Sequence, residues 1–357
     1  AGVRLRHPYH WALGALLAVV VALTVGVAVA HPSADPAGGG PGDAAASLAP
    51  SSGREQVPDF TGIVRWINSP PLTRAELRGK VVLIDFWTFS CVNCTRTIPH
   101  LRALYDAYRA RGLVIVGVHS PEFDFEKDPG NVAAAVRRLG VTWPVAVDSA
   151  MATWNAFSNE YWPAEYLVDR SGRIADFHAG EGEYDATERA VVALLGGGAT
   201  DAPAVPAAAP GSTITPELYA GSDRGGLGDG ERYGAQGAAV DYPDRGAPSA
   251  RDQITVAGPW ADHGEYLEAA GPGRVRLRFH ASDVYVVAGS AAGRLTVGVS
   301  LDGAPVPDAL RGPDLGAGGV AVAGPDLRHV LHGVAAGDHV VDLTVPAGLR
   351  LYTFTFG

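Results

Sequence analysis

The sequence is poor in several residue types that would define a class of protein. Its 357 residues include only two cysteines, which excludes a disulfide-stapled secreted mini-domain and any cysteine-rich zinc or iron–sulfur site. Lys and Arg number 28 against 38 Asp and Glu, and the net charge of −10 argues against a protein that binds nucleic-acid phosphates. Lysine occurs only at Lys80 and Lys127, which indicates a GC-rich genome. Hydrophobic residues make up 47%, so the chain can bury substantial cores.

A long apolar run stands near the N-terminus. Residues 11–30 carry no charge, and as a helix they would span the hydrocarbon layer of a bilayer, which is roughly 30 Å thick. Arginines occur in residues 1–10, and the next Lys or Arg is Arg54, so we expect residues 1–10 in the cytoplasm and everything after residue 30 outside. We expect a single transmembrane helix. The alternatives are a cleaved signal peptide and, because the chain begins without methionine, the last span of a longer membrane protein.

Changes in composition divide the rest of the chain. Residues 31–58, rich in Ala, Gly, Pro and Ser, predict a flexible linker, and residues 199–212 predict a second, Ala/Pro-rich one. Between them, residues 59–198 alternate apolar β-branched runs with helical patterns, which predicts a mainly parallel sheet covered by helices. Its expected strands are residues 80–87, 113–119, 143–148, 163–169 and 173–178, the last two antiparallel, and its expected helices are residues 91–111, 129–139 and 184–195.

The C-terminal residues 213–357 have a different pattern. Short apolar or alternating runs are separated by Gly, Pro and Asp, and there is no convincing amphipathic helix. This pattern predicts an antiparallel β-sandwich. Its expected strands are residues 274–279, 284–287, 295–301, 320–322, 339–345 and 349–356.

Both cysteines fall in one motif, Cys91-Val92-Asn93-Cys94, between an expected strand and an expected helix. The unpaired N–H groups and positive dipole end of a helix N-terminus stabilise a thiolate, so Cys91 is the expected nucleophile. Cys94 lies one turn further on and can close a small disulfide with Cys91, which makes the pair a reversible two-electron switch. A structural disulfide here would add little stability, because the loop that it closes is very short. A zinc site at the cysteines would lack two ligands, because His329 and His332 are distant and are expected in strands. We therefore expect the Cys91–Cys94 disulfide as the only cofactor and no metal.

Asp85 lies inside an otherwise apolar strand pattern, six residues before Cys91. A buried carboxylate without a partner is costly, so its pKa should be raised. It could then accept the proton of Cys94 when that thiol attacks a mixed disulfide. The alternative is a strand-end aspartate bonded to neighbouring backbone.

Residues 80–99, KVVLIDFWTFSCVNCTRTIP, resemble the active-site strand and helix of thioredoxin-like proteins. They are similar to the exported TlpA-type, or redoxin-type, branch. Together with residues 66–72, 118–123 and 161–166, they are most similar to the C-terminal part of DipZ-type cytochrome c biogenesis proteins. The resemblance covers residues 59–198 and implies a thioredoxin-like thiol-disulfide oxidoreductase.

The resemblance also implies roles for single residues. Cys91 matches the attacking cysteine, Cys94 the resolving cysteine and Asp85 the buried acid. Pro163 matches the cis-proline that faces the disulfide, which leaves the backbone of Trp162 free to pair with a bound peptide. The same resemblance places Trp162 and Trp87 as substrate-binding residues.

One position departs from the pattern. TlpA-type reductases commonly carry a glutamate two residues before the proline of the active-site helix, and this sequence has Thr97 there. A carboxylate that would tune the thiols is therefore missing, and no redox potential is predicted. The partners that the resemblance implies are exported thiol or disulfide proteins such as apocytochrome c, and a membrane electron donor of the CcdA or DsbD type.

The C-terminal unit carries a resemblance of its own. Residues 215–219, 281–285 and 352–357 are similar to the C-terminal β-domain of DipZ-type proteins, which is itself similar to carbohydrate-binding modules. Binding of cell-wall glycan would use exposed aromatic rings, for which Trp260, Tyr266 and Tyr352 are the candidates. The alternative is that these rings pack in the core.

Three functions compete on this basis. The favoured one is a membrane-anchored, extracytoplasmic thiol-disulfide oxidoreductase that reduces exported disulfides. A peroxiredoxin-like thiol peroxidase is the second, because Thr88 and Cys91 fit the TxxC motif of that class, although the proline it carries seven residues before the cysteine is Ile84 here. The third is a cell-envelope carbohydrate-binding or scaffold protein.

Overall fold

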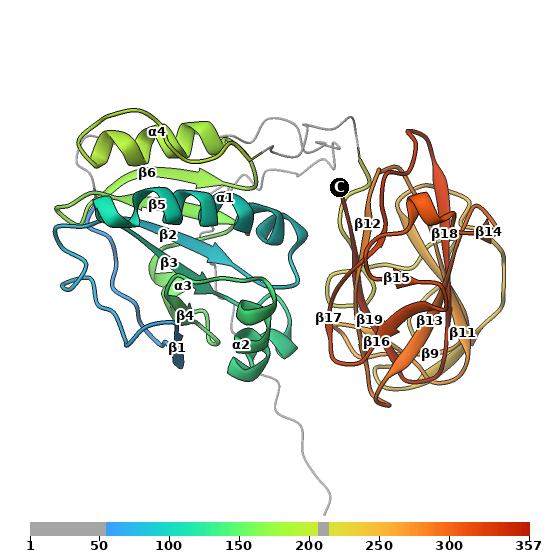
Figure 1. Ribbon diagram of the computed structural model, residues 1–357. Coiled ribbons are helices and arrows are strands. Elements are labelled where there is room, and N and C mark those ends of the chain that lie inside the picture. Colours follow the sequence, from blue (N-terminus) through green and yellow to red (C-terminus); the bar gives the residue numbers. More distant parts are fainter. Residues whose placement is uncertain (1–54, 206–213) are drawn as a thin grey trace, which may run out of the picture. The chain divides into compact units, whose positions relative to one another are not determined.

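The computed structural model describes residues 55–205, here called the α/β part, and residues 214–357, here called the β part (Figure 1). The expected cytoplasmic flank, the expected spanning helix, residues 31–54 of the first expected linker and residues 206–212 of the second lie outside these residues. Within the described ranges, no helix is both long enough and apolar enough to cross a membrane.

The α/β part is built on a six-stranded sheet with the order β1-β4-β3-β2-β5-β6. Strands β2, β3 and β4 are parallel, whereas β1, β5 and β6 each run antiparallel to a neighbour. The predicted parallel strands and the predicted antiparallel pair of β5 and β6 are both present, whereas the antiparallel edge strand β1 was not predicted. Strands β5 and β6 are joined by a tight turn, which permits only an antiparallel pair. The strands are β1 (Arg65–Ile67), β2 (Val81–Trp87), β3 (Leu113–His119), β4 (Val145–Val147), β5 (Ala164–Val168) and β6 (Ile174–Ala179).

Helices cover the sheet of the α/β part (Figure 1). The predicted helices α1, α2 and α4 are present, with Pro99 inside α1. The short elements β1 and α3 were not predicted, because three to five residues are too few to show a periodic pattern. The helices are α1 (Val92–Tyr108), α2 (Pro129–Arg138), α3 (Ala152–Ala156) and α4 (Tyr184–Leu194), with short 3-10 turns η1 (Arg109–Arg111) and η2 (Asp124–Lys127).

Strand β2 is buried along its whole length and separates two cores. Leu83 and Trp87 pack into the core that contains Cys94 and the apolar face of α1. Val82 and Ile84 pack into the core on the opposite side of the sheet. Side chains alternate along a strand, so Asp85 shares a face with Leu83 and Trp87. The strand pattern thus places Asp85 on the side of the sheet that α1 covers.

The β part is one continuous antiparallel sheet of 13 strands that wraps around a single hydrophobic core. Strands β15 and β17, at the two ends of the ordered path, contact each other, so the sheet is nearly closed. The all-β prediction is confirmed, but the strands are not divided into two separate sheets. The strands are β7 (Leu218–Tyr219), β8 (Ala239–Tyr242), β9 (Gln253–Asp262), β10 (Leu267–Ala269), β11 (Gly273–Phe279), β12 (Val284–Ser290), β13 (Leu295–Leu301), β14 (Ala304–Pro305), β15 (Leu315–Gly316), β16 (Gly319–Val322), β17 (Asp326–Leu331), β18 (His339–Val345) and β19 (Leu349–Phe356), with one 3-10 turn, η3 (Asp308–Leu310).

Gly117 in β3 is the parallel neighbour of Asp85 and lies against two tryptophans. A Cβ at this position would lie 2.9 Å from Trp87 Nε1 and 3.3 Å from Trp143 Nε1. Both rings are fully buried and have no free space to move into. We expect Gly117→Ala to lower the free energy of unfolding, measured by urea denaturation, by about 1–3 kcal/mol.

Gly298 in β13 provides the matched control for this substitution. A Cβ there would meet its nearest neighbour at 3.5 Å, an ordinary contact. Gly298→Ala should therefore change the free energy of unfolding by no more than about 0.5 kcal/mol. Equal losses in the two variants would contradict the steric argument for Gly117.

Candidate active site

The two cysteines stand at the N-terminus of α1. Cys91 is the N-cap residue with extended backbone, and its Sγ accepts a hydrogen bond from the Cys94 N–H at 3.3 Å. Cys91 is partly exposed, whereas Cys94 is buried, and the two are not bonded to each other. Burial, together with the hydrogen bond to Cys91, raises the pKa of the Cys94 thiol well above its ordinary value. Cys91 is thus placed to meet a substrate, while Cys94 needs a base before it can attack.

Asp85 lies in β2, the strand that leads into the cysteine loop. It is 3% exposed, and its Oδ1 has no hydrogen-bond partner among the described residues. A charge on Asp85 contributes to raising the pKa of Cys94, so the two groups interact. The strand-end alternative for Asp85 is wrong, because the residue lies inside the strand and its Oδ1 is unpaired.

Glu165 in β5 is the antiparallel register partner of Asp85. Directly opposed residues of an antiparallel pair point to the same face, with Cβ atoms about 5 Å apart. Burial raises the pKa of Asp85 well above its ordinary value, and the charge of Glu165 adds to this effect. Burial also raises the pKa of Glu165 to about 7. Two buried carboxyl groups this close together do not both ionise readily, so the pair can hold a proton near neutral pH.

Glu165 also lines a small pocket of the α/β part. Asp176, His178 and Thr187 line this pocket with it, and Thr187 Oγ1 donates a hydrogen bond to Glu165 Oε2 at 3.2 Å. Asp176 is exposed, so the pocket connects Glu165 with the surface. Glu165 was not predicted as a site residue, although it lies within residues 161–166, which carry part of the family resemblance. A second charge in an apolar strand pattern was the available signal.

A third buried carboxylate, Glu126 in η2, holds the loop that leads into Cys91. Its Oε1 accepts hydrogen bonds from Thr88 Oγ1 at 2.5 Å, from Ser90 Oγ at 2.6 Å and from the Ser90 N–H at 3.2 Å. Its Oε2 accepts the N–H groups of residues 122 and 123 at 2.7 and 3.1 Å. Glu126 was missed by the sequence analysis, because it is one of three acids within residues 122–126 and nothing local distinguishes it. It is a positioning residue for the cysteine loop.

Glu126 should make stability depend on pH. Burial raises its pKa from 4.5 to about 7, although hydrogen bonds from Ser90 and Thr88 act in the opposite direction. The folded protein therefore keeps a proton that the unfolded chain has already released, and stability falls as pH rises through this window. We expect the free energy of unfolding of the wild type, relative to Glu126→Gln, to fall by on the order of 3 kcal/mol between about pH 4.5 and about pH 7.5.

Urea denaturation at several pH values measures this difference. Glu160, an exposed glutamate of the same part, supplies the control variant Glu160→Gln. That variant should follow the wild type across the pH range. If the free energy of unfolding depended on pH in the same way in the wild type and in Glu126→Gln, Glu126 would not be the group that keeps a proton in the folded state.

The peptide bond between Trp162 and Pro163 is cis, as the resemblance implies. Pro163 directly precedes β5, whose Ala164 pairs with Phe86, so it lies level with the end of β2 from which the cysteine loop starts. The Trp162 ring is partly exposed, packs against Trp154 at 4.2 Å between centroids and donates its indole N–H to the Ser120 carbonyl. Among the described residues, nothing hydrogen-bonds to the backbone N–H or carbonyl of Trp162.

Trp87 does not fit the role that was predicted for it. Its side chain is 2% exposed and belongs to the core with Cys94. Its ring meets the imidazole of His119 edge-on at 5.2 Å. The prediction of Trp87 as a substrate-binding residue is therefore wrong, because the alternation of β2 points it into the core. Thr97 is also buried and donates its hydroxyl to the Asn93 carbonyl within α1, so it supplies no charge to the thiols.

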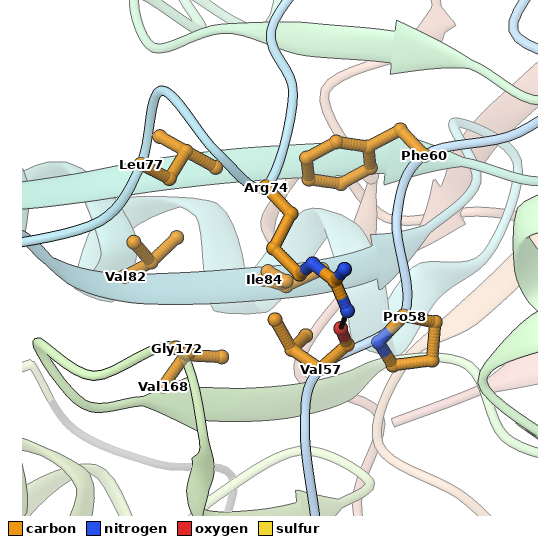
Figure 2. Close-up of a pocket in the computed structure, with 9 residues that line it drawn as sticks. All are labelled: Val57, Pro58, Phe60, Arg74, Leu77, Val82, Ile84, Val168 and Gly172. Carbon is orange, nitrogen blue, oxygen red and sulfur yellow. Dashed lines mark hydrogen bonds between the residues drawn. The ribbon is translucent and has the colours of Figure 1, made fainter.

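An apolar pocket of the α/β part lies away from the cysteines. Figure 2 shows Val82 and Ile84 of β2 lining it, on the face of the strand opposite to Asp85. Its one charged side chain, Arg74, donates a hydrogen bond to the Val57 carbonyl at 3.2 Å. The pocket is therefore separate from the thiol chemistry.

The three aromatic residues predicted to bind carbohydrate lie in different surroundings. Trp260 is 1% exposed within the core of the β part, and its indole N–H donates to the Ala257 carbonyl. Tyr352 is 4% exposed. The prediction of an exposed ring is wrong for Trp260, which faces the core of the β part. Tyr352 has little exposed surface, but it does not belong to that core. Tyr266 is partly exposed, but its ring is flanked by His263 at 4.9 Å and by the Arg350 guanidinium at 5.0 Å.

Comparison with known families agrees with this division of the chain. The AhpC/TSA family matches residues 54–177, and the family described as thioredoxin like C-terminal domain matches residues 215–357. The protein DipZ of Mycobacterium tuberculosis is 38% identical over 318 residues. That match covers 84% of this chain but only 43% of DipZ, so the chain spans less than half of the length of this relative.

Shorter relatives match the α/β part alone. The thiol-disulfide oxidoreductase YkuV of Bacillus subtilis is 36% identical over 143 residues, which is 40% of this chain and 95% of YkuV. The thiol-disulfide oxidoreductase ResA of Halalkalibacterium halodurans is 30% identical over 126 residues, which is 35% of this chain and 68% of ResA. With nearly the whole of YkuV matched, and with a CxxC motif at the start of α1, the chain belongs to the thioredoxin-like thiol-disulfide oxidoreductases.

Proposed function

We propose that this protein reduces disulfide bonds of other proteins through the dithiol of Cys91 and Cys94. One observation carries the proposal. A partly exposed Cys91 caps α1, with a buried Cys94 one turn later and a buried carboxyl pair on the same side of the sheet. An attacking thiol must be accessible, and a resolving thiol must be shielded and supplied with a base.

The first step is attack by the Cys91 thiolate on one sulfur of the substrate disulfide. The substrate S–S bond breaks, a mixed disulfide with Cys91 forms, and one substrate thiolate leaves. The free backbone N–H and carbonyl of Trp162 support this step, because an extended substrate segment can pair with them beside the cis-proline Pro163.

The second step is resolution by Cys94. Asp85 takes the proton from the Cys94 thiol, and Glu165 passes the proton on to the pocket lined by Asp176 and His178. The Cys94 thiolate then attacks the Cys91 sulfur, the mixed disulfide breaks, and the second substrate thiolate leaves. Two electrons have moved to the substrate, and the Cys91–Cys94 disulfide remains to be reduced by an external dithiol donor.

The test of this function is reduction of insulin by the full chain with dithiothreitol as the electron source. We expect a rate far above that of dithiothreitol alone, and no acceleration by the double variant Cys91→Ser, Cys94→Ser. The reduction potential of the cysteine pair tests the direction. A reductase requires a value of about −230 mV or lower, whereas a value near −120 mV is typical of an oxidant and would overturn the reducing role.

The anchored, extracytoplasmic location is part of the same proposal. Its support is the uncharged run of residues 11–30 behind a basic flank. The chemistry then calls for exported substrates, with apocytochrome c as the expected class, and for a membrane dithiol donor of the CcdA or DsbD type. Protease treatment of intact cells and of opened cells tests the location. The extracytoplasmic location would be contradicted if the folded parts resisted the protease in cells whose cell membrane is intact but whose outer layers admit the protease.

A thiol peroxidase is the second candidate, and the match to the AhpC/TSA family favours testing it. Peroxide reduction by this class would use the hydroxyl of Thr88 beside Cys91. That hydroxyl instead donates to Glu126 Oε1. We therefore expect stopped-flow measurements to show peroxide consumption no faster than by free cysteine. A much faster rate would favour the peroxidase.

A further inference from the structure

Three metal-ligating side chains meet in the β part, in a place that the thiol chemistry does not use. Asp283 directly precedes β12, His329 lies in β17, and His332 follows β17. Strands β12 and β17 are antiparallel neighbours, which brings these distant positions together. The sequence analysis placed both histidines in strands and did not connect them with Asp283.

The ligand atoms of the three side chains converge. Asp283 Oδ1 lies 2.8 Å from His329 Nε2 and 2.7 Å from His332 Nδ1, and all three atoms lie within 4.8 Å of one another. The two imidazole rings are perpendicular, with centroids 5.6 Å apart, so each directs a nitrogen to the same carboxylate without blocking the other. Zinc binds such ligands at about 2.0–2.2 Å, so small side-chain movements would admit an ion between them.

Neighbouring groups hold two of the ligands in place. Ser282 Oγ donates to the second carboxylate oxygen, Asp283 Oδ2, at 2.5 Å. The His329 ring stacks on Tyr285 at 4.1 Å, and its backbone N–H donates to Asp314 Oδ2 at 2.7 Å. Hydrogen bonds and packing of this kind fix the orientation of side chains that ligate a metal.

We propose that Asp283, His329 and His332 bind a divalent transition-metal ion, with zinc as the reference ion. Two imidazoles and one carboxylate form a three-ligand set that leaves a further position for water. The side chain of His332 is 63% exposed, which leaves that position open to solvent. This site is independent of the proposed disulfide reduction.

Two other histidine–aspartate pairs in the β part show what is distinctive here. His280 Nδ1 lies 3.1 Å from Asp338, and His339 Nδ1 lies 2.7 Å from Asp302. Among the residues that the structure describes, each of these carboxylates contacts one histidine, so neither pair offers three ligands there. They have the same residue types and similar distances, and they provide controls for binding by a single histidine.

The test is isothermal titration of the full chain with zinc ions alone. A reduced CxxC dithiol also binds zinc, so the titration uses the double variant Cys91→Ser, Cys94→Ser as the parent. We expect His332→Ala in this parent to weaken zinc binding at least tenfold, and His339→Ala to leave it unchanged. His332 is chosen because its exposed side chain can be removed without disturbing the core.

Cobalt provides a second measurement that does not depend on affinity alone. We expect the parent to give the visible absorption of a four- or five-coordinate cobalt site, and both His332→Ala and Asp283→Asn to lose it. The proposal is overturned if the parent binds no zinc, if His332→Ala binds it as tightly as the parent, or if His339→Ala causes an equal loss. In those cases the three side chains form a hydrogen-bonded cluster only.

Discussion

Cys91→Ser is expected to reduce the rate of insulin reduction to that of dithiothreitol alone, whereas Cys94→Ser is expected to trap substrate on the protein. The two variants differ because only Cys91 is accessible. Without Cys91 no thiolate meets the substrate disulfide. Without Cys94 the first attack still takes place, but the mixed disulfide cannot be resolved from within the protein.

Non-reducing gel electrophoresis and intact-mass measurement detect the trapped species. The Cys94→Ser variant, mixed with a disulfide substrate in the absence of dithiothreitol, should gain the mass of one substrate chain through Cys91. The Cys91→Ser variant should form little or none of this adduct, because Cys94 is buried. Equal trapping by the two variants would reverse the assignment of attacking and resolving cysteines.

Asp85→Asn is expected to slow resolution about a hundredfold near neutral pH, which is the lower end of the roughly 10²–10⁴ that a positioned general base contributes to a rate. The reason is the high pKa of the buried Cys94 thiol, which keeps it protonated unless a nearby group accepts its proton. The slowed rate should rise with pH more steeply than in the wild type, because hydroxide then has to supply the missing base.

A gain in stability should accompany this loss in rate. Burial and the charge of Glu165 raise the pKa of Asp85, so the folded state binds a proton that the unfolded chain releases, and stability is lost as pH rises. Asparagine has no such proton, so Asp85→Asn should have the higher free energy of unfolding at neutral pH. A slower but more stable protein would separate a role in proton transfer from damage to the fold.

Glu165→Gln tests whether the second carboxyl acts through the first. In the wild type this change should slow resolution, but in the Asp85→Asn background it should add little, because the relay is already broken. Glu188 in α4, a buried glutamate that accepts hydrogen bonds from the Tyr108 hydroxyl and the Ala202 N–H, provides the control variant Glu188→Gln. Additive effects of Asp85→Asn and Glu165→Gln would exclude a serial relay.

Much of the α/β part followed from local pattern. The bounds expected for β3 coincide with those observed, and β2 and α1 differ by one to three residues at their ends. Continuous apolar runs and helical spacing are local signals, so the strand, the loop and the helix that carry the cysteines could be read directly. For the same reason, the position of Cys91 at a helix N-terminus and the burial of Asp85 could be predicted.

The residues that were assigned wrong roles are those whose exposure to solvent was predicted incorrectly. Trp87 and Trp260 were expected at binding surfaces, but both lie at inward-facing strand positions. The presence of an aromatic residue in the sequence does not show whether its ring faces a ligand or packs in the core. Strand β9 was also missed, because glycine and proline interrupt its apolar pattern.

The sequence by itself determined the redox motif, its place between β2 and α1, and the acid beneath it. Only the tertiary structure decided which other groups join them. Glu165 faces Asp85 because β5 pairs with β2 in one register, and Glu126 reaches the cysteine loop from η2. The Asp283, His329 and His332 cluster likewise exists because β12 pairs with β17. Such contacts depend on strand register and chain return between distant segments, and local periodicity carries no information about either.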